Sequence, residues 1–301
     1  MEGATRIELD GQYRVLHEAA GVLERETRRT LVVAGPDAGE YLQGQLTNDV
    51  EALAPGEGCY AALLDHKGKL RADMRVLRIG PEALQVDAEA IAREVLRHNF
   101  ETYSLGRDVR ATDHTDKLTV SSVIGPAARG RLGIELPDEE HAFVEGELGL
   151  YVATDLGVDV IGSKPDLPGA GEETAECLRI ESGRPRLGFD MGGATIPQEA
   201  GLNERAVSFT KGCYVGQETV ARLHYKGKPN RHLRGLRLSE PAQHGDPIQL
   251  GDEQKELGTV GSACVSPRHG PIALALVRRE AELGDEVIVG DSAAKVVDLP
   301  F

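Results

Sequence analysis

The last quarter of the chain constrains the fold more than any other part. Five short apolar segments follow one another there at fairly even spacing, with Gly and Pro between them: Leu236–Leu238, Pro247–Leu250, Gly258–Val260, Ile272–Val277 and Glu286–Val289. Short strands separated by turn residues are typical of small β-barrels and sandwiches. The sequence therefore predicts a C-terminal β-barrel domain over residues 230–301, after a larger region over residues 1–229.

The larger region alternates between strand-like and helix-like segments. Apolar runs predict strands at Leu31–Ala34, Tyr60–Leu64, Leu70–Ile79 and Leu118–Ile124, and helical spacing predicts helices at Ala38–Leu46, Asp87–Leu105 and Glu172–Glu181. This alternation indicates an α+β fold, and we expect two interleaved subdomains, the second at roughly residues 113–170. No glycine-rich phosphate-binding motif follows a strand, so a phosphate-loop nucleotide site is not expected.

Charge and cysteine content exclude several classes of function. The chain has 301 residues and a net charge of -15, which argues against a nucleic-acid or anionic-membrane partner. Met1–Asp10 is acidic and polar, unlike a secretory signal, so we expect a cytoplasmic location. Cys59, Cys177, Cys213 and Cys264 form no C-x-x-C pair and have no His at zinc-finger spacing, which predicts reduced thiols and no bound metal.

One stretch, Lys211–Glu218, concentrates unusual chemistry around a cysteine. Gly212 and Gly216 flank Cys213, and a helix is expected to begin at Gln217. A nearby lysine and a helix N-terminus both favour a thiolate, so the sequence predicts a reactive Cys213 assisted by Lys211. Further members of the predicted motif are Gly212, Tyr214, Gly216, Gln217 and Glu218. The alternative is a buried structural cysteine in a glycine turn.

Two other features suggest a ligand. Glu181 ends a predicted helix, where a carboxylate is unfavourable unless it has another partner. That partner is either a ligand or a neighbouring arginine, Arg179 or Arg184. The window Thr219–Ser239 contains six basic residues and no acidic residue, and it either attracts an anionic ligand or is a solvated strand face. The basic residues are Arg222, Lys226, Lys228, Arg231, Arg234 and Arg237.

These segments together resemble the YgfZ family, which is related to the aminomethyltransferase T-protein of glycine cleavage. The octad Lys211–Glu218 resembles the segment that distinguishes YgfZ-like proteins from aminomethyltransferases. The other similar segments are Tyr41–Val50, Leu63–Lys69, Leu178–Gly183, Ile196–Leu202, and Gly258–Ser262 with Ser266–Pro267 and Ile272–Ala275.

The resemblance implies a multi-domain ring whose central hole holds tetrahydrofolate or another reduced folate. It implies a role in assembly or repair of iron–sulfur clusters in client enzymes, and a link to tRNA modification. Glu181 matches the carboxylate that binds the pterin, and a carboxylate suits two parallel N–H donors. The further residues assigned to the cofactor are Asn48, Asp49, Asp73 and Arg222. The implied partners are the folate and iron–sulfur client or assembly proteins.

One departure bears on catalysis. Aminomethyltransferases carry an Asp-Asp pair after the hairpin, whereas this chain has Ala72 followed by Asp73. Methylene transfer needs an acidic residue near the reacting amine, so the change favours the YgfZ-like role. Three functions remain open: an accessory factor for iron–sulfur proteins, a folate-dependent aminomethyl or one-carbon transferase, and a scaffold whose folate is only structural. Whether the protein is an enzyme is also open.

Overall fold

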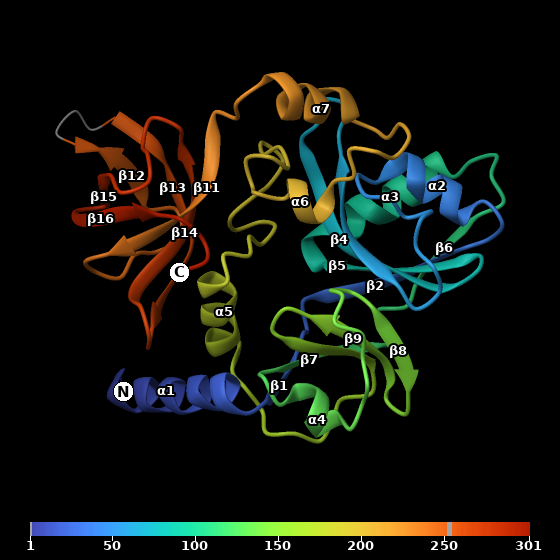
Figure 1. Cartoon of the computed structure of the whole chain (residues 1–301), viewed down its shortest axis with the longest axis horizontal. Helices are drawn as coiled ribbons and strands as arrows, with labels where there is room; N and C mark the ends of the chain where they lie inside the picture. The colour runs from blue at the N-terminus through green and yellow to red at the C-terminus, as the bar shows by residue number, and fades with distance from the viewer. Residues whose placement is uncertain (1, 252–254) are drawn as a thin grey trace. The chain divides into compact units, whose positions relative to one another are not determined.

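The computed structural model describes residues 2–251 and 255–301 (Figure 1). The chain divides into two compact units. The first comprises Met1–Lys67, Arg71–Glu172 and Glu204–Gln217, and the second comprises Gly68–Leu70, Glu173–Asn203 and Glu218–Phe301. The chain therefore crosses between the units several times. The boundary between residues 229 and 230, as the border of independently folding domains, stays a prediction.

The first unit contains two five-stranded sheets. One has the order β1-β7-β10-β9-β8 and the other β3-β4-β5-β2-β6. The strands of the first sheet are β1 (Gly21–Glu24), β7 (Thr119–Ile124), β8 (Phe143–Gly146), β9 (Gly149–Thr154) and β10 (Gly157–Gly162). Those of the second are β2 (Arg28–Ala34), β3 (Gly58–Leu64), β4 (Leu70–Gly80), β5 (Ala83–Glu89) and β6 (Arg110–Asp113). Its helices are α1 (Glu2–Glu18), α2 (Ala38–Gln45), η1 (Ala90–Ala92), α3 (Arg93–Tyr103), α4 (Ala128–Leu132) and α6 (Asn203–Ala206).

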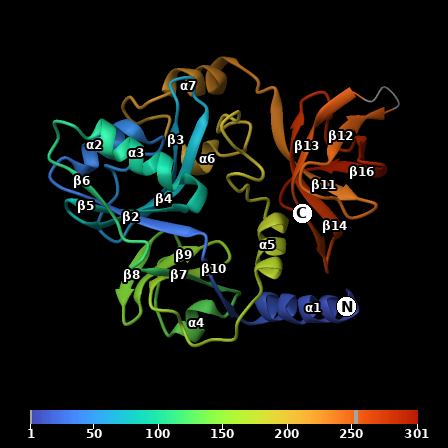
Figure 2. The ribbon, with the colours of Figure 1, turned by 180° about the vertical axis from the view of Figure 1, so that it is seen from behind.

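Buried apolar side chains stabilise the second sheet and the pair of helices that accompanies it. The β4 and β5 strands pair antiparallel, and their Val76 and Val86 lie opposite each other and are fully buried. Helices α2 and α3 lie side by side in both views and meet through Tyr41 and Phe100, whose rings pack edge to face (Figures 1 and 2). Such contacts add aromatic packing to the burial of apolar area.

The second unit is built on α5 (Glu172–Glu181), α7 (Gln217–Lys226) and a closed barrel. The barrel order is β11-β14-β13-β12-β15-β16. Its strands are β11 (Arg231–Leu238), β12 (Pro247–Leu250), β13 (Lys255–Ser266), β14 (Gly270–Arg278), β15 (Glu286–Val289) and β16 (Ser292–Val297). Leu236, Ile248, Leu257 and Val260 are among the side chains that fill it. The predicted α+β fold with a C-terminal barrel is confirmed.

Two local predictions need correction. The helix predicted over Asp87–Leu105 is wrong at its start, because β5 continues to Glu89 and α3 begins only at Arg93. Asp87 lies in the middle of a buried strand that pairs with β2 and β4, and sheet pairing there overrides local helical spacing. Asp37 stands directly before the helix predicted at Ala38–Leu46, a position that predicts it as the N-cap. Its side chain makes no cap hydrogen bond and instead accepts one from the backbone N–H of Asp108.

Among the described residues, the helices are too short or too polar to cross a membrane.

Candidate functional site

Lys211 anchors the cysteine motif to the first unit. Its ammonium donates hydrogen bonds to the carbonyl oxygens of Gln43, Leu46 and Asn48 at 2.6, 2.7 and 2.9 Å. The last carbonyls of a helix lack partners within the helix, and here the lysine supplies donors where α2 ends. Burial lowers the pKa of Lys211 to about 8, so the side chain still carries its charge at neutral pH.

The contacts of Lys211 differ from the role that the sequence suggested. The ammonium is used by three carbonyl groups, and the thiol whose charge couples to it is Cys59. The structure thus gives Lys211 an anchoring function, and assistance to Cys213 stays a prediction.

The remainder of the motif presents Cys213 at the surface. Cys213 is exposed, while the next residue, Tyr214, is buried, and burial raises the Tyr214 pKa to about 12. The N–H of Val215 donates to the carbonyl of Gly44, and the Gln217 amide donates to the carbonyl of Gly212. The thiol therefore lies on a segment that is fixed on both sides. The alternative of a buried structural cysteine at this position is wrong.

The two glycines of the motif have different roles. Gly216 has a φ of +82°, which residues other than glycine rarely adopt, and α7 begins at the next residue. A Cβ atom at Gly212 would meet nothing within 4 Å. Gly216 is thus required by the backbone, whereas Gly212 leaves the space beside Cys213 open. Glu218 lies in the first turn of α7, where its charge suits the helix dipole.

Asn48 and Asp49 organise the chain that follows α2. The Asn48 amide donates to the carbonyls of Tyr60 and Arg205, and its own oxygen accepts from the N–H of Asp49. The Asp49 carboxylate accepts from Gln43 and from the N–H of Ala52. Both side chains are engaged in internal contacts, so their predicted contact with a cofactor stays a prediction.

Asp73 has the most unusual environment of the predicted residues. It lies on β4 with 7% of its surface exposed, and its Oδ2 accepts the Tyr60 hydroxyl at 2.5 Å. Its Oδ1 is buried and has no hydrogen-bond partner among the described residues. Burial raises the pKa of Asp73, and the Tyr60 hydrogen bond only partly offsets this. A buried oxygen without a partner is costly, which points to a ligand or water there.

Tyr60 escaped sequence analysis although it completes this arrangement. The guanidinium of Arg205 lies 5.1 Å from the centre of the Tyr60 ring, and Arg205 also pairs with Glu140. A cation over the ring fixes the orientation of the phenol. The only sequence signal was the position of Tyr60 in the strand that forms a hairpin with the strand of Asp73.

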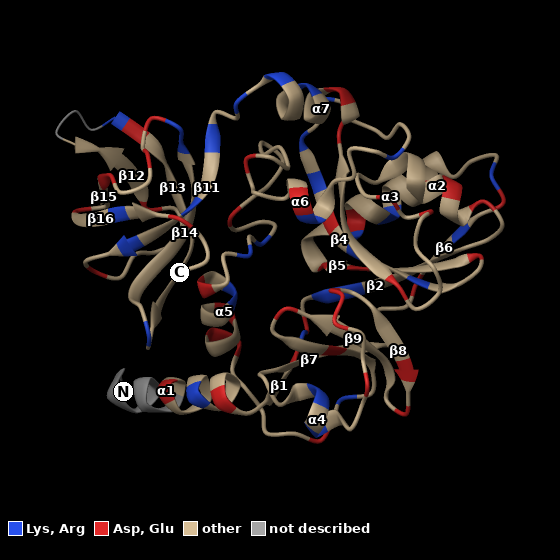
Figure 3. Ribbon diagram, in the orientation of Figure 1, with Lys and Arg blue, Asp and Glu red and all other residues tan. Residues whose placement is uncertain are grey.

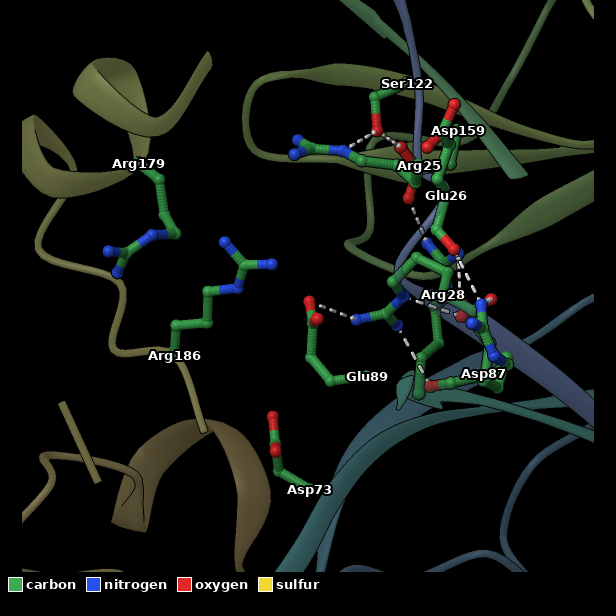
Figure 4. Close-up of polar contacts among 12 residues, drawn as sticks. Arg25, Glu26, Arg28, Asp73, Asp87, Glu89, Ser122, Asp159, Arg179 and Arg186 are labelled. Atoms are coloured by element: carbon green, nitrogen blue, oxygen red, sulfur yellow. Dashed lines mark hydrogen bonds and ion pairs between the residues drawn. The ribbon is translucent and has the colours of Figure 1, made fainter. Parts of the chain in front are cut away.

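An ionic network joins the two sheets of the first unit (Figure 4). Asp87 is fully buried and binds the guanidinium groups of both Arg28 and Arg75, and Arg75 also binds Asp159 at 2.8 Å. Burial acts to raise the pKa of Asp87, but Arg28 and Arg75 outweigh it and hold the pKa below its ordinary value. Because Asp87 belongs to β5 and Asp159 to β10, Arg75 fixes one sheet against the other.

Glu181 is a second buried carboxylate, located in the second unit. It ends α5 with 9% of its surface exposed, and its Oε1 accepts the Ser266 hydroxyl from β13. The sequence offered Arg179 or Arg184 as a partner. The Arg179 donors are used by Glu176, Asp190, Ser262 and the carbonyl of Arg184, and pairing with the Arg184 side chain stays a prediction. Arg179 is therefore not the cation that satisfies Glu181.

The basic window separates into two halves (Figure 3). Arg231 binds Glu199 at 2.8 Å, Arg234 lies 3.7 Å from Asp298, and Arg237 lies over the Phe301 ring. By contrast, Arg222, Lys226 and Lys228 are exposed at and after α7, and none of them has an ion pair within the described part of the chain. The free positive charge is thus confined to the first half.

The sequence of the chain is similar to that of known proteins. The model of the GCVT N-terminal domain matches residues 8–141, and that of the glycine cleavage T-protein C-terminal barrel domain matches residues 231–301. The chain is 30% identical over 249 residues to the tRNA-modifying protein YgfZ of Colwellia psychrerythraea, covering 76% of each chain. It is 31% identical over 256 residues to that of Klebsiella pneumoniae, covering 77% of each.

The chain belongs to the YgfZ and glycine cleavage T-protein family. An aminomethyltransferase of Rubrobacter xylanophilus is 27% identical over 97% of this chain and 86% of that protein. The crystal structure of aminomethyltransferase T from Bartonella henselae matches with a TM-score of 0.86 at 21% identity, over 97% of this chain and 89% of that one. This likeness establishes the aminomethyltransferase fold for the YgfZ-related chain.

No group of three or more His, Cys, Asp or Glu side chains suited to a metal ion occurs in residues 2–251 and 255–301.

Proposed function

We propose that this chain binds tetrahydrofolate or another reduced folate and supports the assembly or repair of iron–sulfur clusters in client enzymes, with Cys213 as a reactive thiol. The observation that carries the proposal is the Glu181 carboxylate. It is buried and held by Ser266, so it is a preorganised acceptor. The N–H donors on the edge of an aminopterin ring complement such a group.

Cys213 supports the accessory role. The thiol is exposed, while Lys211 and Tyr214 on either side of it are buried. A client protein or a sulfur-bearing species can therefore reach the thiol without displacing the motif. We expect iron–sulfur client or assembly proteins as partners, and we place the protein in the cytoplasm.

The YgfZ relatives are named as tRNA-modifying proteins. We propose that this chain contributes indirectly, through a client enzyme, since its net charge of -15 disfavours direct binding of nucleic acid.

Three cations suit the anionic end of a folate. Arg222, Lys226 and Lys228 lie in the same unit as Glu181 and are free of ion pairs within the described residues. We assign the glutamate tail to them, because exposed cations attract a polyanion at low ionic strength.

A folate-dependent aminomethyl or one-carbon transferase is the second candidate. Asp73 favours it, because its Oδ1 is buried without a described partner and its raised pKa suits proton exchange with an amine. Ala72 disfavours it, since the first acid of the transferase pair is absent. If the chain is a transferase, Asp73→Asn should abolish turnover. If it is an accessory factor, the same variant should still support cluster assembly or repair.

Calorimetry with tetrahydrofolate tests the proposal directly. Glu181→Gln should weaken binding by about 1.5–3 kcal/mol, the range for hydrogen bonds to a charged group. Glu173→Gln is the matched control, because Glu173 lies on the same helix but is exposed. Equal dissociation constants for Glu181→Gln and the wild type, with both proteins folded, would remove Glu181 from the ligand site.

Support of iron–sulfur client enzymes is measured separately, in cells from which the resident protein of this family has been deleted. Cys213→Ser should bind folate normally but fail to restore the activity of iron–sulfur enzymes. A folate-binding protein whose Cys213→Ser variant restores those activities fully would instead be a scaffold with structural folate.

A further inference from the structure

Two other cysteines meet inside the second unit. Cys177 lies on α5 and Cys264 on β13, 87 residues apart in sequence, yet their sulfur atoms are 3.2 Å apart. Both are free thiols. Cys177 is 1% exposed and Cys264 is half-buried. Cys264 is thus the more exposed residue of the pair.

The surroundings favour reaction between the sulfurs over metal binding. Ile180, Ile272 and Leu274 form the buried part of the adjoining apolar cluster, against which Cys264 packs. The Glu181 carboxylate, which accepts the Ser266 hydroxyl, lies 3.7 Å from the Cys177 sulfur, and the described residues offer no set of three metal-binding side chains. A tetrahedral metal needs more donors than the two thiols provide.

We propose that Cys177 and Cys264 are an oxidisable dithiol, which a peroxide converts reversibly into a disulfide that links α5 to β13. The sulfurs need to approach by only about 1 Å to reach the bonding distance of about 2.05 Å. The two elements are already fixed together. The backbone N–H and the hydroxyl of Ser262 on β13 both donate to the Asp190 carboxylate, and Arg179 on α5 donates to Asp190 and to Ser262. Ordinary side-chain rotation therefore suffices.

The different exposure of the thiols sets the order of events. Peroxide oxidises the Cys264 sulfur to a sulfenic acid and leaves as water. The Cys177 sulfur then attacks the Cys264 sulfur, the S–S bond forms, and the sulfenic hydroxyl leaves as a second water with the Cys177 proton. The balance is two thiols and one peroxide to one disulfide and two waters. A small dithiol reverses it by exchange.

Glu181 is placed to take the Cys177 proton and pass it to the departing hydroxyl. Its Oε1 lies 3.7 Å from the Cys177 sulfur. The Cys264 thiol and burial together raise the pKa of Cys177. The Cys177 thiol therefore resists direct alkylation, and it reacts with the Cys264 sulfur once that sulfur has been oxidised. Oxidation also removes the S–H group beside Glu181. If the proposed folate function holds, disulfide formation changes folate affinity at this carboxylate.

The test uses the full chain with Cys213→Ser, so that the exposed thiol cannot form disulfides between molecules. Treatment with hydrogen peroxide should remove two hydrogen atoms from the intact mass and leave a cross-linked pair of peptides containing Cys177 and Cys264. Dithiothreitol should reverse both changes, and the oxidised protein should melt at a higher temperature. Cys264→Ala should lose the cross-link, and Cys59→Ala, the matched control, should retain it.

The proposal is overturned if Cys264 gains oxygen atoms without a cross-link, if Cys59 enters the cross-link instead, or if the two thiols survive a peroxide dose that oxidises a free model thiol. Tetrahydrofolate binding by the reduced and oxidised proteins is then compared. Failure of the reduced protein to bind folate sinks the proposed function but leaves the dithiol standing. A missing cross-link in a protein that binds folate sinks only the dithiol.

Discussion

The Tyr60 hydroxyl donates to Oδ2 of Asp73 at 2.5 Å, while the second oxygen of the same carboxyl group has no hydrogen-bond partner among the described residues. The aromatic ring lies under the Arg205 guanidinium, which fixes the direction of the hydroxyl. One oxygen of the carboxyl group is thus held by the protein, and the other is buried without a partner among the described residues.

Asp73 should give folding stability a recognisable pH dependence. Its folded-state pKa is raised above the ordinary value of 3.8, chiefly by burial. Between those two values the folded protein binds more protons than the unfolded chain, so stability falls as pH rises through this window. Asp73→Asn should remove that fall, and urea unfolding at a series of pH values measures it.

Tyr60→Phe is the companion variant. The hydroxyl lowers the Asp73 pKa, so its loss should raise that pKa further and extend the fall in stability to higher pH. Identical pH profiles for the wild type and Asp73→Asn would show that Asp73 does not titrate abnormally.

Lys211→Met should destabilise the first unit by about 2–4 kcal/mol, because three carbonyl groups, one buried and two part-buried, lose a charged donor. Lys67→Met is the control, since Lys67 is exposed in a turn and should change stability by less than about 0.5 kcal/mol. Denaturant unfolding gives both values.

The same variant separates anchoring from activation of the thiol. The Lys211→Met protein could instead keep wild-type stability while its Cys213 alkylates roughly tenfold more slowly at neutral pH. That result would show that the Lys211 ammonium activates the thiolate and is not an anchor.

Cys213 should be the first cysteine to react with an alkylating reagent near neutral pH. It is exposed, whereas burial raises the pKa of Cys59 to about 12, and Cys264 together with burial raises that of Cys177. Peptide mapping after brief alkylation gives the order. Cys213→Ser should change stability by less than about 0.5 kcal/mol, and faster labelling of Cys59 than of Cys213 would contradict the exposed position.

The cations of α7 should contribute to binding only through the tail of the ligand. Replacing Arg222, Lys226 and Lys228 together by Ala should weaken binding of a polyglutamyl tetrahydrofolate by about 1–2 kcal/mol and reduce its salt dependence. Arg279→Ala, an exposed change on the barrel, is the control. An equal loss for a ligand without the glutamate tail would place these cations elsewhere in the site.

Local sequence determined the elements and much of the fold class. Gly and Pro between short apolar runs predicted the barrel strands, and helical spacing predicted α2 and α5, because both patterns depend on residues close together in the chain. The same reasoning failed at Asp87, since its charge and spacing suit a helix while its partners, Arg28 and Arg75, come from neighbouring strands.

Only the tertiary structure decided what the functional side chains contact. Lys211 meets the carbonyl of Leu46 across 165 residues, Tyr60 reaches Asp73 across a hairpin, and Cys177 meets Cys264 across 87 residues. The sequence singled out Lys211, Asp73 and Cys213 by type and motif. It could not assign their partners, because those depend on which faces of strands and helices pack together, and a contact between distant residues leaves no periodic signal in either segment.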